Sequence, residues 1–187
     1  LLCLMKTRWR LLGVIPVLGG LATLPFVTTP DLLISGDAKL VAIKDEAGHY
    51  WLSSNRAARF SAEIWLRRNG QLESASFRDP KAPGPSALSC DPLGCSYAGR
   101  GRTIAVALAG EALAEDCVRA DVRLSVVPIR QDCPHPALTV DRFDLWRGGA
   151  HAVWLGASGI RIQSVAAGLG DRPWVLQRMR ESLQQRR

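Results

Sequence analysis

Residues 30–43 read PDLLISGDAKLVAI, and this stretch decides how the folded part of the chain begins. Its two mainly apolar runs, 32–34 and 39–43, flank residues 35–37, whose sequence Ser-Gly-Asp is typical of tight turns. The pattern predicts two strands joined by a short turn. A further strand-like segment at 49–52 follows a glycine turn, so we expect a meander of three strands.

Toward the C-terminus the sequence changes from strand to helix periodicity. Apolar side chains recur at helical spacing between 56 and 68, which predicts an amphipathic helix that ends near Gly70. The next stretch, 74–88, contains three prolines and is expected to be a loop.

The remaining segments alternate between strands and helices. We expect a hairpin at 95–97 and 103–106, a helix at 110–118, strands at 121–127 and 137–140, a helical turn at 141–146, and a closing hairpin at 150–155 and 159–165. This alternation favours an α/β (α+β) domain of layered sheets with flanking helices.

Toward the N-terminus, residues 11–30 carry no charged side chain. A helix of that length rises about 1.5 Å per residue and spans about 30 Å, the thickness of a hydrocarbon core. The sequence therefore predicts one transmembrane helix, with a buried soluble helix as the alternative. The expected organisation is a membrane segment at 1–29, a soluble domain at 30–175 and a basic tail at 176–187.

The charges around the apolar segment predict its orientation. Lys6, Arg8 and Arg10 precede it, and Asp31 follows it. Because basic loops stay in the cytoplasm, the domain is expected on the opposite, periplasmic side of the inner membrane. Leu1 to Leu4 would then end an earlier span of a multi-pass protein; the alternative is a small exported or anchored protein that starts at Met5.

The basic charge belongs to the ends of the chain. The formal net charge is +7, of which residues 1–30 contribute +3 and residues 176–187 another +3. The other residues hold 17 bases and 16 acids and are nearly neutral. The composition of the domain therefore does not indicate a nucleic-acid binding face, although a local patch stays open.

An even number of cysteines follows the apolar segment: Cys90, Cys95, Cys117 and Cys133. In an oxidising compartment they predict disulfides, of which the nearest-neighbour pairing is Cys90 with Cys95 and Cys117 with Cys133. Four cysteines allow three connectivities, and zinc binding or free thiols remain the alternatives.

No catalytic motif is apparent in the sequence. The histidines His49, His135 and His151 are far apart in sequence, and there is no nucleophile elbow or phosphate-binding loop, so we predict no catalytic residue, metal or cofactor. Asp141 and Asp144 have the spacing of a helix N-terminus.

Arginines gather on the expected helix at 56–68. Arg56, Arg59, Arg67 and Arg68 are the densest basic side chains of the domain, and they are the candidates for DNA contact. A solvated outer helix face is the simpler interpretation.

Several segments, in order, resemble one family. They are KTRWR, PDLLISGDAKLVAIKD, AARFSAEIWLRRNG, CDPLGCSY, GEALAEDCVRADV, VDRFDLWRGGAHAVWL and DRPW. Together they resemble the C-terminal end of alphaproteobacterial ComEC-type competence proteins, the inner-membrane channels of DNA uptake. The resemblance implies a metallo-β-lactamase-like domain, with single-stranded DNA and other competence proteins as partners.

The resemblance also implies that this domain is degenerate. Residues 36–38, Gly-Asp-Ala, resemble the Gln-Gly-Asp-Ala turn of metal-binding relatives, and residues 119–122 resemble a segment before their late histidines. The His/Asp ligand motif is absent, and Val-Val-Pro at 126–128 stands where those histidines would be. We therefore expect a metal-free interaction module, with a residual nuclease as the rival.

Overall fold

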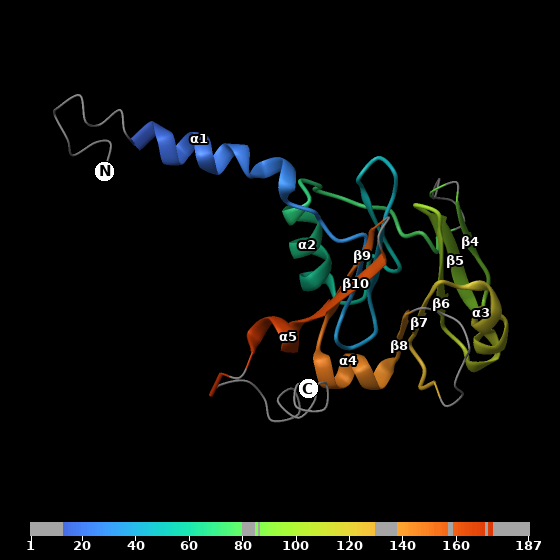
Figure 1. Cartoon of the computed structure of the whole chain (residues 1–187). Coiled ribbons are helices and arrows are strands. Elements are labelled where there is room, and N and C mark those ends of the chain that lie inside the picture. The colour runs from blue at the N-terminus through green and yellow to red at the C-terminus, as the bar shows by residue number, and fades with distance from the viewer. Residues whose placement is uncertain are drawn as a thin grey trace.

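The structure is a computed structural model that describes residues 13–79, 85, 87–129, 138–156, 159–170 and 172–173. Residues 1–12 with the basic cluster, Cys133 and the tail at 176–187 lie outside these ranges. Within them the chain forms two five-stranded sheets with helices around them (Figure 1), and the expected α+β class is confirmed.

The first sheet contains the predicted meander. Its order is β10-β9-β1-β2-β3, and all neighbouring strands are antiparallel. The strands are β1 (Leu32–Ile34), β2 (Val41–Lys44), β3 (Tyr50–Leu52), β9 (His151–Gly156) and β10 (Gly159–Ser164). The closing hairpin therefore pairs with the first strand of the domain, and β1 occupies the centre of this sheet.

The second sheet mixes antiparallel and parallel pairs in the order β4-β5-β6-β7-β8. Its strands are β4 (Leu88–Cys90), β5 (Gly94–Gly99), β6 (Arg102–Ala107), β7 (Val122–Ser125) and β8 (Leu138–Val140). β7 is parallel to both of its neighbours, and parallel neighbours need a crossover connection. Between β6 and β7 the short helix η3 (Gly110–Ala112) and helix α3 (Leu113–Arg119) supply it.

The main core lies between the two sheets. Apolar side chains from both inner faces meet there, among them Leu32, Ile43 and Val153 from the first sheet and Ile104, Val122 and Val140 from the second. Because side chains alternate along a strand, the opposite face of the first sheet presents a second apolar set, which includes Leu40 and Ala42.

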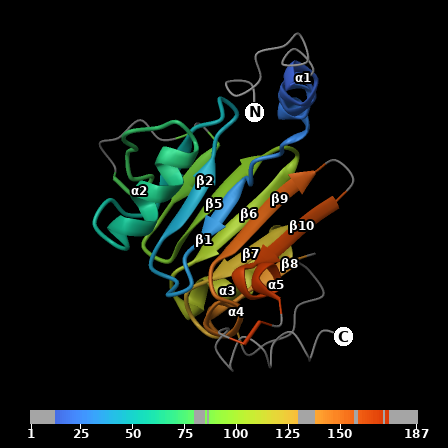
Figure 2. The ribbon, with the colours of Figure 1, turned by 90° about the vertical axis from the view of Figure 1, so that its left-hand side faces the viewer.

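Helices cover the outer faces and one end of this sandwich. Helix α2 (Arg59–Arg68) covers the second apolar set with Ala62 and Leu66, and α3 packs against β6 on the far side (Figure 1). The layers therefore run helix, sheet, sheet, helix. Helices α4 (Arg142–Gly148) and α5 (Val165–Leu169) contact each other at the end opposite α1 (Figure 2).

Local hydrogen bonds move the ends of some predicted elements. The helix expected from 56 begins at Arg59, because the Ser54 hydroxyl accepts the N–H groups of Arg56 and Ala57 and holds a turn there. The strand expected to reach 127 ends at Ser125, whose hydroxyl bonds to both the N–H and the carbonyl of Val127. Strand β4 was not expected at all.

The apolar segment forms a shorter helix than its composition predicts. Helix α1 covers Val14–Ala22, and a 3-10 turn, η2, follows at Leu24–Phe26. The break has a local cause, since Pro25 has no N–H and the Thr23 hydroxyl bonds to the Gly20 carbonyl at 2.6 Å. Within the described ranges, none of the helices has both the length and the apolar character that a membrane crossing needs.

Helix α1 buries none of its residues. It projects from the sandwich (Figure 1), and its valine, isoleucine and leucine side chains are exposed, as is Phe26 in η2 at 82%. An exposed apolar surface of this kind normally marks an interaction with a membrane or a partner.

Residues 27–30, here called the linker, join this segment to the sandwich and are fixed to it. Trp154 Nε1 donates to the Thr28 carbonyl at 3.0 Å, and the Tyr50 hydroxyl donates to the Pro30 carbonyl at 2.6 Å. The Lys44 ammonium also donates to the Thr29 hydroxyl. The linker is therefore part of the folded domain.

Asp31, directly after the linker, connects the two sheets. It is only 5% exposed, and its carboxylate accepts the Leu155 N–H of β9 at 2.7 Å. Its other oxygen lies 3.2 Å from Arg100 Nε, in the turn between β5 and β6. A buried carboxylate is tolerated only when it is paired and hydrogen-bonded, and here both sheets supply a partner.

We predict that Asp31→Ala lowers the free energy of unfolding by about 2 kcal/mol, because it leaves the buried Leu155 N–H without its acceptor. Urea denaturation followed by circular dichroism measures the effect. Glu73→Ala removes the same charge from an exposed position and serves as the control, with an expected change of about 0.5 kcal/mol or less. Equal stability of the two variants would contradict the assigned role.

Candidate functional site

The end of the sandwich near α4 contains the turn at 36–38 and the loop after β7. The resemblance to ComEC-type proteins relates both segments to a metal site. Asp141 caps α4, since its carboxylate accepts the N–H groups of Phe143 and Asp144 at 2.8 and 2.9 Å. The Asp144 carboxylate in turn accepts the Asp141 N–H. This pair of bonds completes a capping box and confirms the predicted helix start. The second Asp141 oxygen accepts the Ile129 N–H at 3.3 Å, and so fixes the loop after β7.

The turn at residues 36–38 packs against the other end of α4. A Cβ atom on Gly36 would lie 3.1 Å from the Ala150 nitrogen, so glycine allows the close backbone contact without a shift of its neighbours. Asp37 serves the turn itself, because it accepts the Ser35 hydroxyl at 2.6 Å and the Lys39 N–H at 3.2 Å. Helix α4 therefore ties the turn and the loop after β7 into one edge, here called the α4 edge.

His151, at the start of β9, is buried at this edge. It is 3% exposed, and its Nδ1 lies 2.8 Å from the Gly149 carbonyl oxygen. A Cβ atom on Gly148 would lie 2.8 Å from the imidazole ring of His151. Glycine at this position therefore lets the end of α4 pack against the ring. In the described part of the chain, no group of three or more His, Cys, Asp or Glu side chains is placed to hold a metal ion.

The Asp37 carboxyl has a lowered pKa. Partial burial works to raise the pKa, but the Ser35 hydroxyl, the Lys39 N–H and the Lys39 ammonium stabilise the charged form and outweigh it. A lowered folded-state pKa means that ionised Asp37 stabilises the fold above the ordinary value of 3.8, and that this contribution is lost as the pH falls through the folded value.

We therefore predict that the stability difference between the wild type and Asp37→Ala is larger at neutral pH than at an acidic pH low enough to protonate Asp37, because the pKa of this carboxyl is lowered in the folded state. Urea unfolding at both pH values measures it. Glu73→Ala, which removes an exposed carboxylate, is the control. A difference that grew toward acid would contradict the sign of the pKa shift.

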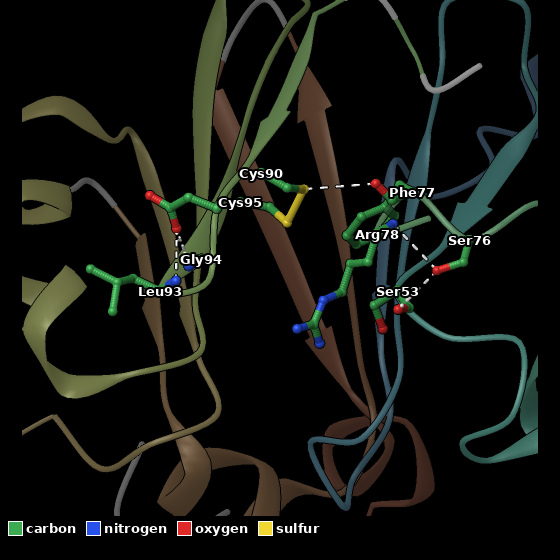
Figure 3. Close-up of a disulfide and its surroundings, with 9 residues drawn as sticks. Ser53, Ser76, Phe77, Arg78, Cys90, Leu93, Gly94 and Cys95 are labelled. Atoms are coloured by element: carbon green, nitrogen blue, oxygen red, sulfur yellow. Dashed lines mark hydrogen bonds between the residues drawn. A yellow bond between two sulfur atoms is a disulfide. The ribbon is translucent and has the colours of Figure 1, made fainter. Parts of the chain in front are cut away.

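A disulfide joins Cys90 in β4 to Cys95 in β5 (Figure 3). The two residues are directly opposite each other in the antiparallel pair. Cys95 is buried in the core between the sheets, while the Cys90 sulfur contacts the carbonyl oxygen of the core residue Phe77 at 3.8 Å. Cys117 is also disulfide-bonded, and Cys133 lies outside the described residues, so their predicted pairing stays a prediction.

We predict that Cys90→Ser together with Cys95→Ser lowers the free energy of unfolding by about 2 kcal/mol, the chain-entropy value for so short a loop. Chemical denaturation of the oxidised proteins measures the loss. Under reducing conditions the difference should shrink, because the wild type then also lacks the crosslink. An unchanged difference would mean that the serines disturb packing by themselves.

The four candidate DNA-contacting arginines lie in α2 or just before it. Arg56 precedes α2, and Arg59 lies in its first turn. At about 100° per residue, Arg67 falls on the same side of the buried stripe as Arg59, whereas Arg68 falls on the opposite side. Arg67 is bonded to Glu63 at 2.6 Å. Their contact with DNA stays a prediction.

A mainly apolar pocket of about 230 Å³ lies beside Arg68. The linker (Thr29, Pro30), the outer face of the first sheet (Leu33, Tyr50) and α2 (Trp65, Arg68, Asn69) form its walls, and we call it the linker pocket. Burial raises the pKa of Tyr50 to about 12, with a further contribution from the charge of Asp31, so its hydroxyl stays protonated. No pattern in the sequence predicts this pocket, because its walls come from three separate segments.

A second pocket, of about 190 Å³, lies between α3 and the outer face of the second sheet. Its lining includes Asp91, Glu111, Glu115 and Asp116 but only one cation, Arg119. Burial raises the pKa of Asp116, and the charges of Glu115 and Asp91 add to this effect. The negative lining disfavours a polyphosphate ligand on this side of the domain.

Comparison with known proteins finds no relative: no protein-family model matches the chain, and no curated protein or solved structure matches it.

Proposed function

We propose that this chain is the C-terminal part of a ComEC-type DNA-uptake protein of the inner membrane. Its domain at 30–175 is a degenerate metallo-β-lactamase-like module without metals, which contributes to transformation by interaction. Single-stranded DNA and other competence proteins are its partners, and the domain faces the periplasm.

The observation that carries this proposal is an exposed apolar segment held at a fixed place on a two-sheet sandwich. Helix α1 and η2 expose their apolar side chains, which a bilayer would cover. The break near Pro25 is compatible with insertion, since prolines are tolerated in membrane segments. The anchored linker would then hold the domain close to the membrane surface.

The layers and one edge of the sandwich support the family assignment. Helix, sheet, sheet, helix is the order expected of a metallo-β-lactamase-like domain. The turn at 36–38 and the loop after β7 meet α4, and the resemblance relates both segments to the metal site. Asp37, Asp141 and His151 all make hydrogen bonds within the fold, which supports a structural role for this edge.

The disulfide supports the orientation of the domain. Cys90 and Cys95 are bonded, and structural disulfides form and persist in oxidising compartments such as the periplasm. The positive-inside rule places the domain on the same side.

We predict that in-frame deletion of the codons for residues 30–175, in a naturally transformable host that carries this gene, reduces transformation to the level of a strain without the gene. Counting transformants and following uptake of fluorescent DNA measure the loss. A second strain carries Gln at the four arginines Arg56, Arg59, Arg67 and Arg68, and Arg119→Gln on α3 is its control. If the four arginines contact DNA, the strain with the four glutamines is impaired and the Arg119→Gln strain is not.

Two results would contradict the proposal. Normal transformation after the deletion would remove the domain from DNA uptake. Cleavage of DNA by the purified chain, abolished by a metal chelator, would contradict the metal-free assignment and favour a nuclease with a rearranged site.

A further inference from the structure

We propose that the linker pocket binds an anionic phospholipid of the membrane that holds α1. This inference rests on the proposed membrane attachment, and it names a ligand and a residue, Arg68, that the attachment itself does not require.

The position of the pocket is the first argument. Thr29 and Pro30, which form one wall, are only a few residues beyond the exposed Phe26 of η2. The hydrogen bonds from Tyr50 and Trp154 fix the linker to the sandwich, so the pocket keeps its place beside the base of the apolar segment. If that segment is inserted, the pocket opens at the level of the lipid head groups.

The chemistry of the walls is the second argument. Pro30, Leu33, Tyr50 and Trp65 offer apolar and aromatic surface, which suits the glycerol region and the first part of an acyl chain. Tyrosine and tryptophan are also the side chains that prefer the boundary between head groups and hydrocarbon. The pocket volume of about 230 Å³ is below that of typical sites for whole small molecules, so it suits a ligand that remains mainly in the bilayer.

Charge is the third argument. Arg68 is exposed at the rim of the pocket, and within the described residues none of the ion pairs of α2 involves it. The other polar side chains of the walls are engaged: Asn69 donates to the Gly48 carbonyl, and the Thr29 hydroxyl accepts from Lys44. The Lys44 ammonium also lies 5.6 Å from the centre of the Tyr50 ring. One cation, Arg68, therefore lines an apolar site, and a second, Lys44, contacts its wall residues Thr29 and Tyr50. This combination is complementary to a lipid phosphate.

The test uses the full chain in phosphatidylcholine vesicles with or without about three parts in ten of phosphatidylglycerol. A trace of either lipid carries a photoactivatable group in its acyl chain, and mass spectrometry maps the labelled peptides. We expect phosphatidylglycerol to label the peptides that contain Pro30, Tyr50 or Trp65 more strongly than phosphatidylcholine does.

Arg68→Gln is expected to reduce this labelling about fivefold, the effect of one basic side chain at an anionic surface. Arg67→Gln is the matched control, because Arg67 lies in the same helical turn, pairs with Glu63 and does not line the pocket. Equal labelling by both lipids, or equal labelling of the two variants, would overturn the inference. Competition by soluble glycerol phosphate would also overturn it, because the site would then recognise a free phosphate ester.

Flotation of the chain with the vesicles, and its resistance to alkaline carbonate, report membrane insertion separately. A chain that floats but is not labelled at the pocket disproves the lipid site and leaves the attachment intact. A chain that does not float disproves the attachment, and the lipid site with it.

Discussion

The buried carboxylate of Asp31 is the interaction on which the arrangement of this domain depends. Its backbone N–H and carbonyl pair with Val153 and Lys44, so the residue belongs to the first sheet. Its side chain accepts the Leu155 N–H in that sheet and forms an ion pair with Arg100 from the second. The Asp31 carboxylate is buried, whereas Arg100 is partly exposed, so the pair favours the approach of the two sheets where the linker arrives.

Because Asp31 is fixed, the linker before it is fixed as well. Tyr50 and Trp154 hold two linker carbonyls. Trp154 comes from β9, to which Asp31 is bonded through Val153, and Tyr50 comes from β3, which pairs with β2. The direction in which the chain leaves toward α1, and the pocket that the linker closes against α2, are therefore properties of the sandwich. This end of the domain combines apolar surface with cations.

The opposite end has a different character. Around α4, carboxylates and an imidazole are present, yet the hydrogen bonds of the fold engage Asp37, Asp141 and His151. A reactive site needs such groups to face a cavity and a substrate. Here they cap a helix, close a turn and pack beneath a glycine, which supports a structural role for these side chains.

Much of the fold could be predicted from the sequence, because strand and helix periodicity, turn residues and the helix-capping pair at Asp141 and Asp144 act locally. The sequence by itself determined the meander, α2, α3 and the final hairpin to within a few residues. Only the tertiary structure decided that β7 runs parallel to its neighbours, that Arg68 lines the linker pocket, and that the linker, Tyr50 and Trp65 form the walls of that pocket. Those features depend on contacts between residues distant in the chain, and local periodicity carries no information about such contacts.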